Sequence, residues 1–131
     1  MIGLDANLLI RYFAKDDPDQ TRIAVNLIDS LSPAEPGWIG LVALAELVWV
    51  LNRTYKLKRA GIAAILEKLL AGREVVVEQS DMAHTALRCY LAGKADFPDC
   101  LIALSAKAAG CSRTVTFDRR AARDAGMELL E

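Results

Sequence analysis

Four acidic residues occupy positions that suit metal-assisted chemistry as well as simple helix capping. Asp5 ends the first apolar segment, and Glu46 is the only charged residue between Gly37 and Leu51. Asp99 lies in the first turn of a predicted helix, and Asp118 follows a short predicted strand. Taken singly, each Asp is explained as a helix cap or as a favourable charge near a helix N-terminus. An ionised Glu46 needs either solvent or a compensating cation on so apolar a helix.

These carboxylates could bind a metal ion if their side chains lie close together. Ligands bind at the carboxyl ends of the strands of a parallel sheet, so we expect Asp5 and Asp118 on the same sheet edge. Converging carboxylates repel one another and raise each other's pKa, and a bound hard cation relieves that repulsion. Oxygen ligands without His or Cys favour Mg²⁺ or Mn²⁺ over zinc. The four acids therefore predict a Mg²⁺ or Mn²⁺ site.

Short apolar strands alternate with longer helices along the chain, which favours a parallel sheet covered by helices. We predict strands over residues 1–5, 37–39, 74–77, 114–116 and 127–130. We predict helices over residues 7–14, from Pro18 onward with Asp17 as N-cap, and over 41–53, 58–71, 81–91, 97–109 and 119–124.

The bulk composition sets limits on the class of protein. A chain of 131 residues predicts one domain, residues 1–131, and 53% hydrophobic residues suit a sheet buried on both faces. The net charge of −1 argues against a wholly basic nucleic-acid surface. Three separated cysteines are predicted to be buried thiols, which suits the cytoplasm. No signal peptide is evident, and the longest uncharged run, residues 36–45, is too short to span a membrane.

Four segments together resemble the PIN domain family and, within it, the VapC-type toxins. The segments are IGLDANLLIRYFAKDDP, LVALAELVWVL, ADFPDCLIALSAKAAGC and TVTFDRRAA. The resemblance implies a three-layer α/β/α sandwich with a central, mainly parallel sheet. It also implies a Mg²⁺- or Mn²⁺-dependent endoribonuclease, the toxin of a type II toxin–antitoxin system. The acidic quartet of the family carries over onto Asp5, Glu46, Asp99 and Asp118.

Supporting residues carry over as well. Asp96 matches an additional acid of this subgroup, Asn7 the polar residue after the first Asp, and Thr116 the hydroxyl residue two before the last Asp. Ala6 departs from the family, which usually has Thr there, and we expect the change to tune activity without abolishing it.

The hypothesis for the chemistry is metal-assisted hydrolysis of RNA phosphodiester bonds. We expect Asp5 and Asp99 to hold the metal, with Glu46 and Asp118 in support. The metal would lower the pKa of a bound water for in-line attack. No other nucleophile is evident, since the single His of the chain, His84, has the pattern of a surface residue.

Two basic groups are candidates for holding the RNA backbone. One is the predicted interhelical loop with Arg53, Tyr55, Lys56, Lys58 and Arg59, and the other follows Asp118 with Arg119, Arg120 and Arg123. Arginine and lysine contacts to phosphate position a nucleic acid, and an aromatic ring can stack on an unpaired base. The alternative is that both groups are solvated surface charges.

The resemblance also implies a cognate antitoxin and a homodimer. Trp49, Leu57, Ile62 and Leu66 are candidates for apolar helix surface beyond the core, although a buried helix has the same pattern. The alternative function is a non-catalytic PIN-like module that binds RNA or protein, which the intact quartet disfavours. A receiver or phosphatase domain is a second alternative, but the chain lacks a DxD after the first strand and a Lys after a late strand.

Overall fold

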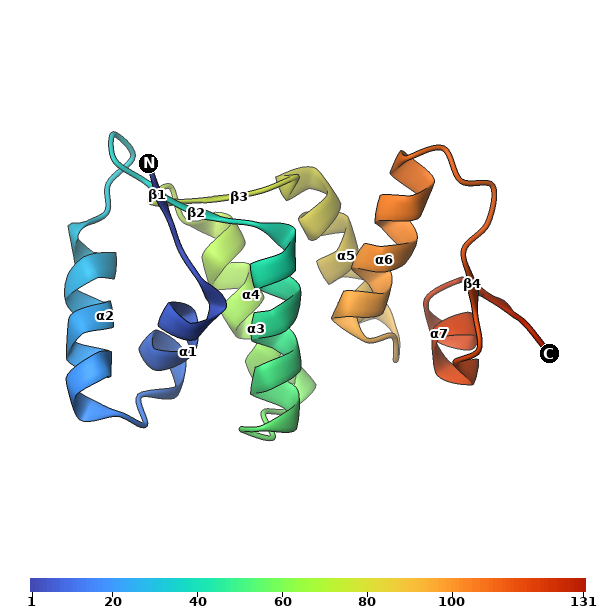
Figure 1. Cartoon of the computed structure of the whole chain (residues 1–131), viewed down its shortest axis with the longest axis horizontal. Helices are drawn as coiled ribbons and strands as arrows, with labels where there is room; N and C mark the ends of the chain where they lie inside the picture. The colour runs from blue at the N-terminus through green and yellow to red at the C-terminus, as the bar shows by residue number, and fades with distance from the viewer. The chain divides into compact units, whose positions relative to one another are not determined.

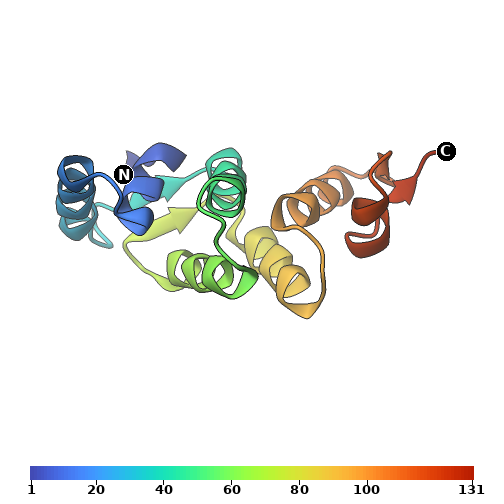
Figure 2. The same ribbon diagram turned by 90° about the horizontal axis from the view of Figure 1, so that it is seen from below.

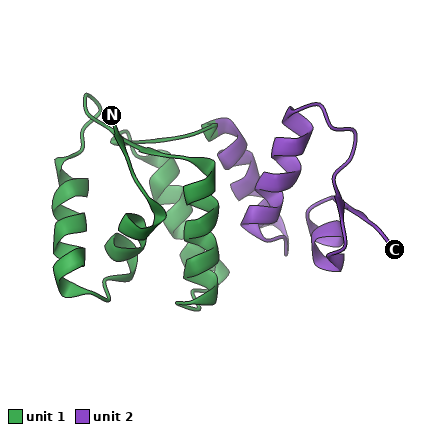
Figure 3. Ribbon diagram, in the orientation of Figure 1, with its two compact units in different colours: residues 1–80 green, residues 81–131 purple.

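The structure is a computed structural model that describes all residues, 1–131. The chain divides into two compact units, Met1–Ser80 and Asp81–Glu131, which Figure 3 colours separately. The prediction of a single domain over residues 1–131 stays a prediction. No helix is long and apolar enough to cross a membrane.

The first unit is built on a three-stranded parallel sheet in the order β1-β2-β3. The strands are β1 (Ile2–Gly3), β2 (Gly37–Ile39) and β3 (Val75–Val77). The helices of this unit are α1 (Ala6–Ala14), α2 (Pro18–Ser30), α3 (Leu41–Arg53) and α4 (Arg59–Ala71). Figures 1 and 2 show α1 and α3 on one face of the sheet and α4 on the other.

Local sequence explains where these elements begin. Asp17 caps α2 by accepting a hydrogen bond from the Gln20 N–H at 3.0 Å, and Pro18 opens the helix, as predicted. In β2, a Cβ on Gly37 would lie 2.6 Å from Leu4 Cδ1, so glycine at this position leaves room for the buried Leu4 side chain. Ile39, fully buried in the middle of the sheet, pairs with Val77.

The second unit contains two longer helices and a small parallel ribbon. Its elements are α5 (Ser80–Ala92, which begins at the last residue of the first unit), α6 (Phe97–Ala108), β4 (Val115–Thr116), α7 (Arg119–Asp124) and β5 (Glu128–Leu129). The strands β4 and β5 pair with each other in parallel. Phe97 is fully buried and meets Tyr90 edge-on at 6.2 Å between ring centroids.

The α/β class with parallel strands is confirmed, and all predicted elements occur within a few residues of their predicted bounds. Within the first unit β1, β2 and β3 form one parallel sheet, and within the second unit β4 pairs with β5. The expectation that Asp5 and Asp118 lie on the same sheet edge stays a prediction.

Two expectations need correction. Ile62 and Leu66 are buried to 1% and 0% exposure, so they belong to the core and offer no surface for a partner. Among the cysteines, Cys100 is buried and Cys89 half-buried, but Cys111 is exposed, because it follows the end of α6 in a surface turn. No disulfide is formed.

Candidate active site

The first acid, Asp5, has a structural role that its position predicts. It is the N-cap of α1, and its Oδ1 accepts a hydrogen bond from the Ala6 N–H at 2.8 Å. Leu4 just before it still donates to the Trp38 carbonyl at 2.8 Å, so the carboxylate stands directly at the end of the β1–β2 pairing. Ala6, the departure from the family pattern, is buried to 1% exposure. The capping bond fixes the Asp5 carboxylate at the sheet edge.

The second acid, Glu46, lies on α3, whose inward face is made by Leu44, Leu47 and Val48. Glu46 itself is exposed, which resolves the question that its apolar surroundings raised: the carboxylate is solvated and not buried. Glu46 and Asp5 line the same open hollow of about 440 Å³.

A third carboxylate, Glu78, lines this hollow together with Asp5 and Glu46, and sequence reasoning missed it. Its Oε1 accepts a hydrogen bond from the Leu41 N–H at 2.9 Å, at the start of α3. This bond replaces a side-chain cap, which Gly40 at the N-cap position lacks. Glu78 directly follows β3, so the rule that drew attention to Asp5 could have found it.

In the second unit, three acids lie at the N-terminal ends of two helices. Asp96 is the N-cap residue of α6, Asp99 lies in its first turn, and Asp118 is the N-cap of α7. The Oδ1 atom of Asp118 accepts from the N–H groups of Arg120 at 2.8 Å and Ala121 at 3.2 Å. Thr116 Oγ1 accepts from the Asp118 N–H at 3.0 Å and so holds the backbone that carries this acid.

These acids influence one another electrostatically. Burial raises the pKa of the half-buried Asp99 carboxyl above its usual 3.8, and the charges of Asp96 and Asp118 raise it further. Arg120 opposes the shift, and its guanidinium lies 3.9 Å from an Asp96 carboxylate oxygen. Within the second unit, Asp99 is therefore repelled by two neighbouring acids, and Arg120 supplies a partial counter-charge. Convergence of all four predicted acids stays a prediction.

The acidic groups are candidate cation ligands. The carboxylates in each unit offer oxygen donors alone, which fits Mg²⁺ or Mn²⁺. No group of three or more His, Cys, Asp or Glu side chains has metal-binding geometry. Each unit supplies its own carboxylates: Asp5, Glu46 and Glu78 from the first, and Asp96, Asp99 and Asp118 from the second.

The remaining predicted residues lie on exposed or half-exposed surface. Asn7 is exposed in the first turn of α1, and Arg119 and Arg120 form the exposed first turn of α7. Arg53 stacks over the Trp49 ring at 4.8 Å from its centroid. Lys56 lies in the loop that joins α3 to α4. Lys58 is the N-cap residue of α4, and Arg59 is the first residue of that helix.

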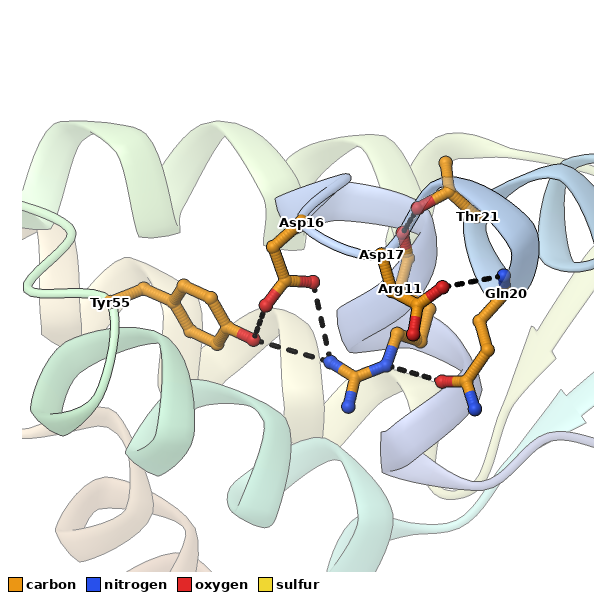
Figure 4. A network of polar contacts seen from close by, with 6 residues as sticks. All are labelled: Arg11, Asp16, Asp17, Gln20, Thr21 and Tyr55. Carbon is orange, nitrogen blue, oxygen red and sulfur yellow. Dashed lines mark hydrogen bonds and ion pairs between the residues drawn. The ribbon is translucent and has the colours of Figure 1, made fainter.

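Tyr55 in that loop is anchored by polar contacts (Figure 4). Its hydroxyl donates to Asp16 Oδ2 at 2.6 Å and lies 3.3 Å from Arg11 Nη1, while Arg11 Nε donates to Gln20 Oε1 at 2.6 Å. The bond from Tyr55 lowers the pKa of Asp16, and the same bond raises the pKa of Tyr55. The hydroxyl therefore ties the loop to the turn between α1 and α2, a role that the sequence did not indicate.

Comparison with known proteins identifies the family. A model of the PIN domain family matches residues 2–126. The chain is also 26% identical over 117 residues to a VapC ribonuclease of Aquifex aeolicus (strain VF5), with 89% of this chain and 87% of the relative covered. The resemblance noted in the sequence is thereby confirmed: the chain belongs to the PIN domain family.

Proposed function

We propose that this protein is a metal-dependent endoribonuclease of the VapC type, the toxin of a type II toxin–antitoxin pair. The proposal rests on the carboxylates of Asp5, Glu46, Asp99 and Asp118, onto which the resemblance in sequence carries the acidic quartet of the family. The match to the PIN domain family over residues 2–126 supports it. The name of the relative, a VapC ribonuclease, supports RNA as the substrate class.

The four acids are the proposed ligands of Mg²⁺ or Mn²⁺, with Asp5 and Asp99 as the main ligands and Glu46 and Asp118 in support. When bound, the ion supplies a water of lowered pKa and positive charge for the phosphate oxygens. The chain's own residues prepare for this. Backbone N–H groups hold Asp5 and Asp118 in place, so little side-chain entropy is lost when they bind a ligand.

Asp99 contributes in a different way. Its raised pKa reports that a negative charge is disfavoured at its position, first by burial and then by Asp96 and Asp118. A cation would relieve that repulsion, and the relief would contribute to the free energy of cation binding. Asp96 is proposed as an additional acid that holds Arg120 beside the cluster.

Basic residues are proposed to hold the RNA backbone. Arg119 and Arg120 follow Asp118 at once, and they would contact phosphates beside the reacting bond. Arg53, Lys56, Lys58 and Arg59 would contact phosphates farther along. The anchored hydroxyl of Tyr55 keeps its ring at a fixed position, from which it would stack on an unpaired base.

The proposed partners are a cognate antitoxin and a second copy of the chain, and the proposed location is the cytoplasm. Within the set expected to form apolar surface, Trp49 is 54% exposed and Leu57 half-buried, so a dimer contact would have to use these and not Ile62 or Leu66. Measuring the mass in solution of the unchanged protein and of Trp49→Ala tests the dimer.

The experiment that tests the function is digestion of total cellular RNA by the purified protein with Mg²⁺, with Mn²⁺ or with EDTA. Asp5→Asn is the matched control, since the Asn side-chain oxygen still accepts from the Ala6 N–H. We expect discrete metal-dependent products that the control lacks. Absence of cleavage, with no rise in melting temperature on adding metal, would contradict the proposal and favour the non-catalytic binding module.

A further inference from the structure

Two of the three cysteines form a close pair that the sequence does not suggest. Cys89 lies on α5 and Cys100 on α6, eleven residues later, and the Cys100 thiol donates to Cys89 Sγ at a sulfur–sulfur distance of 3.0 Å. A disulfide needs about 2.05 Å between the sulfurs, so they must move together by about 1 Å. Both residues belong to the second unit.

The pair can be reached from solvent. Cys89 is half-buried, and both sulfur-bearing residues line a hollow of about 370 Å³ in the second unit. The exposed Cys111 lines the same hollow. Of the pair, the half-buried Cys89 is more accessible to a small oxidant than the buried Cys100.

We propose that Cys89 and Cys100 are a redox-modification site, a dithiol that hydrogen peroxide converts into an intramolecular disulfide. The Cys89 sulfur attacks a peroxide oxygen, the O–O bond breaks, and a sulfenic acid and one water form. The Cys100 sulfur then attacks the sulfenic sulfur, the S–O bond breaks, the S–S bond forms, and a second water leaves with the thiol proton. Two thiols and one peroxide thus give one disulfide and two waters.

The cross-link would fall on the turn that carries the acids of the second unit. The Cys100 N–H donates to the Asp96 carbonyl at 3.1 Å, and Asp99 immediately precedes Cys100. The disulfide therefore joins the first turn of α6 to α5 and restrains the backbone of Asp96 and Asp99. This modification site stands whether or not the protein cleaves RNA.

The test uses the full chain, treated with hydrogen peroxide in its native state, alkylated under denaturing conditions and digested with trypsin. Trypsin places the three cysteines on separate peptides, residues 89–94, 95–107 and 108–113, because basic residues stand between them. We expect the first two peptides to be linked, with the loss of two hydrogen atoms, and dithiothreitol to separate them. Cys89→Ser should abolish the link, while Cys111→Ser should leave it intact.

A second measurement uses the unchanged protein, so it remains informative even if a variant misfolds. The disulfide restricts the unfolded chain, so the oxidised unchanged protein should melt roughly 5 °C higher than the reduced one. Cys89→Ser should show no such rise. Linkage through Cys111 in place of the pair would overturn the proposal, as would a fall in melting temperature on cross-linking, since the native packing would then not accommodate the bond.

Discussion

The carboxylates of the two units are held in different ways. In the first unit, Asp5 and Glu78 accept hydrogen bonds from backbone N–H groups at the starts of α1 and α3, and they share an open hollow with Glu46. No Lys or Arg lines this hollow. In the second unit, Asp99 is half-buried beside two other acids, and Arg120 supplies a counter-charge.

This difference suggests a division of labour. Asp5 and Glu78 are held by backbone N–H groups, and all three acids of the first unit are exposed, so they can offer ligands at little energetic cost to the fold. In the second unit, burial and the two neighbouring acids disfavour the charge of Asp99, and a bound cation would relieve that cost. The first group would then set geometry, and the second would supply much of the drive for cation binding.

The largest effects should come from removing one acid of each group. Asp5→Asn and Asp99→Asn should each lower RNA cleavage by at least about a hundredfold, because even groups that only support metal ligands are worth about 10- to 100-fold. The double variant should be little worse than either single one, since residues that act as a unit are not additive. Initial rates on one RNA substrate measure this.

Independent effects that multiply in the double variant would contradict the shared reaction. Full cleavage in Asp5→Asn together with none in Asp99→Asn would show that the first unit's hollow takes no part. Circular dichroism of each variant controls for loss of the fold.

A smaller effect should follow from removing the counter-charge. Arg120→Ala takes away the cation that faces Asp96 and offsets the raised pKa of Asp99. If Arg120 also contacts phosphate, cleavage should fall roughly tenfold and the salt dependence of RNA binding should weaken by about one phosphate contact. Arg113→Ala is the matched control, because it breaks an exposed ion pair with Glu128 in the same unit. If RNA cleavage falls equally in both variants, the overall positive charge of the unit explains the loss, and a specific contact of Arg120 does not.

Sequence reasoning succeeded where a local rule decides the structure. Asp17 before Pro18 predicted the start of α2, and the apolar run ending at Arg53 predicted the bounds of α3. It failed where long-range contacts decide. Nothing local indicates that Tyr55 bonds to Asp16, or that β4 pairs with β5.

The four acids were predicted because strand ends and lone charges are visible in a sequence, and their shared site stays a prediction. Glu78 also follows a strand, but its bond to the Leu41 N–H depends on a long-range contact that the sequence does not show. The pairing of Cys89 with Cys100 depends on how α5 packs against α6, which spacing along the chain does not reveal. The family identity followed from motif order, which the match over residues 2–126 confirmed.

The bond from Glu78 to the start of α3 gives a prediction about stability. Glu78→Ala removes the acceptor for the Leu41 N–H and should lower the free energy of unfolding by about 1 kcal/mol, the usual worth of a helix cap. Glu46→Ala should change it little, because Glu46 is an exposed residue within the same helix. Urea unfolding measures both.

The Glu78→Gln variant distinguishes the hydrogen bond of Glu78 from its negative charge. Its amide oxygen keeps the bond to Leu41, so stability should be retained, and any loss of cleavage would then report the missing charge in the hollow. A Glu78→Ala protein as stable as the unchanged one would contradict the capping role.

The smallest expected effect concerns how the charge of Asp99 changes the stability of the folded protein. Because the pKa of Asp99 is raised above 3.8 in the folded protein, the folded protein holds this proton more tightly than the unfolded chain does. Stability therefore falls as pH rises from about 3.8 through the folded pKa, and the penalty persists at neutral pH. Asp99→Asn removes the charge, so it should raise the melting temperature in metal-free buffer at neutral pH.

The advantage of Asp99→Asn should shrink as the pH falls below about 3.8, where the unchanged Asp99 is protonated in both states. Asp5→Asn should bring no comparable gain at neutral pH, because its main contact, the bond from the Ala6 N–H, is kept by the Asn oxygen. Melting temperatures of both variants and of the unchanged protein, measured in EDTA across this pH range, test the prediction. A lower melting temperature for Asp99→Asn at neutral pH would mean that its carboxylate is stabilised by its surroundings, and the second unit would then lack the electrostatic drive for cation binding.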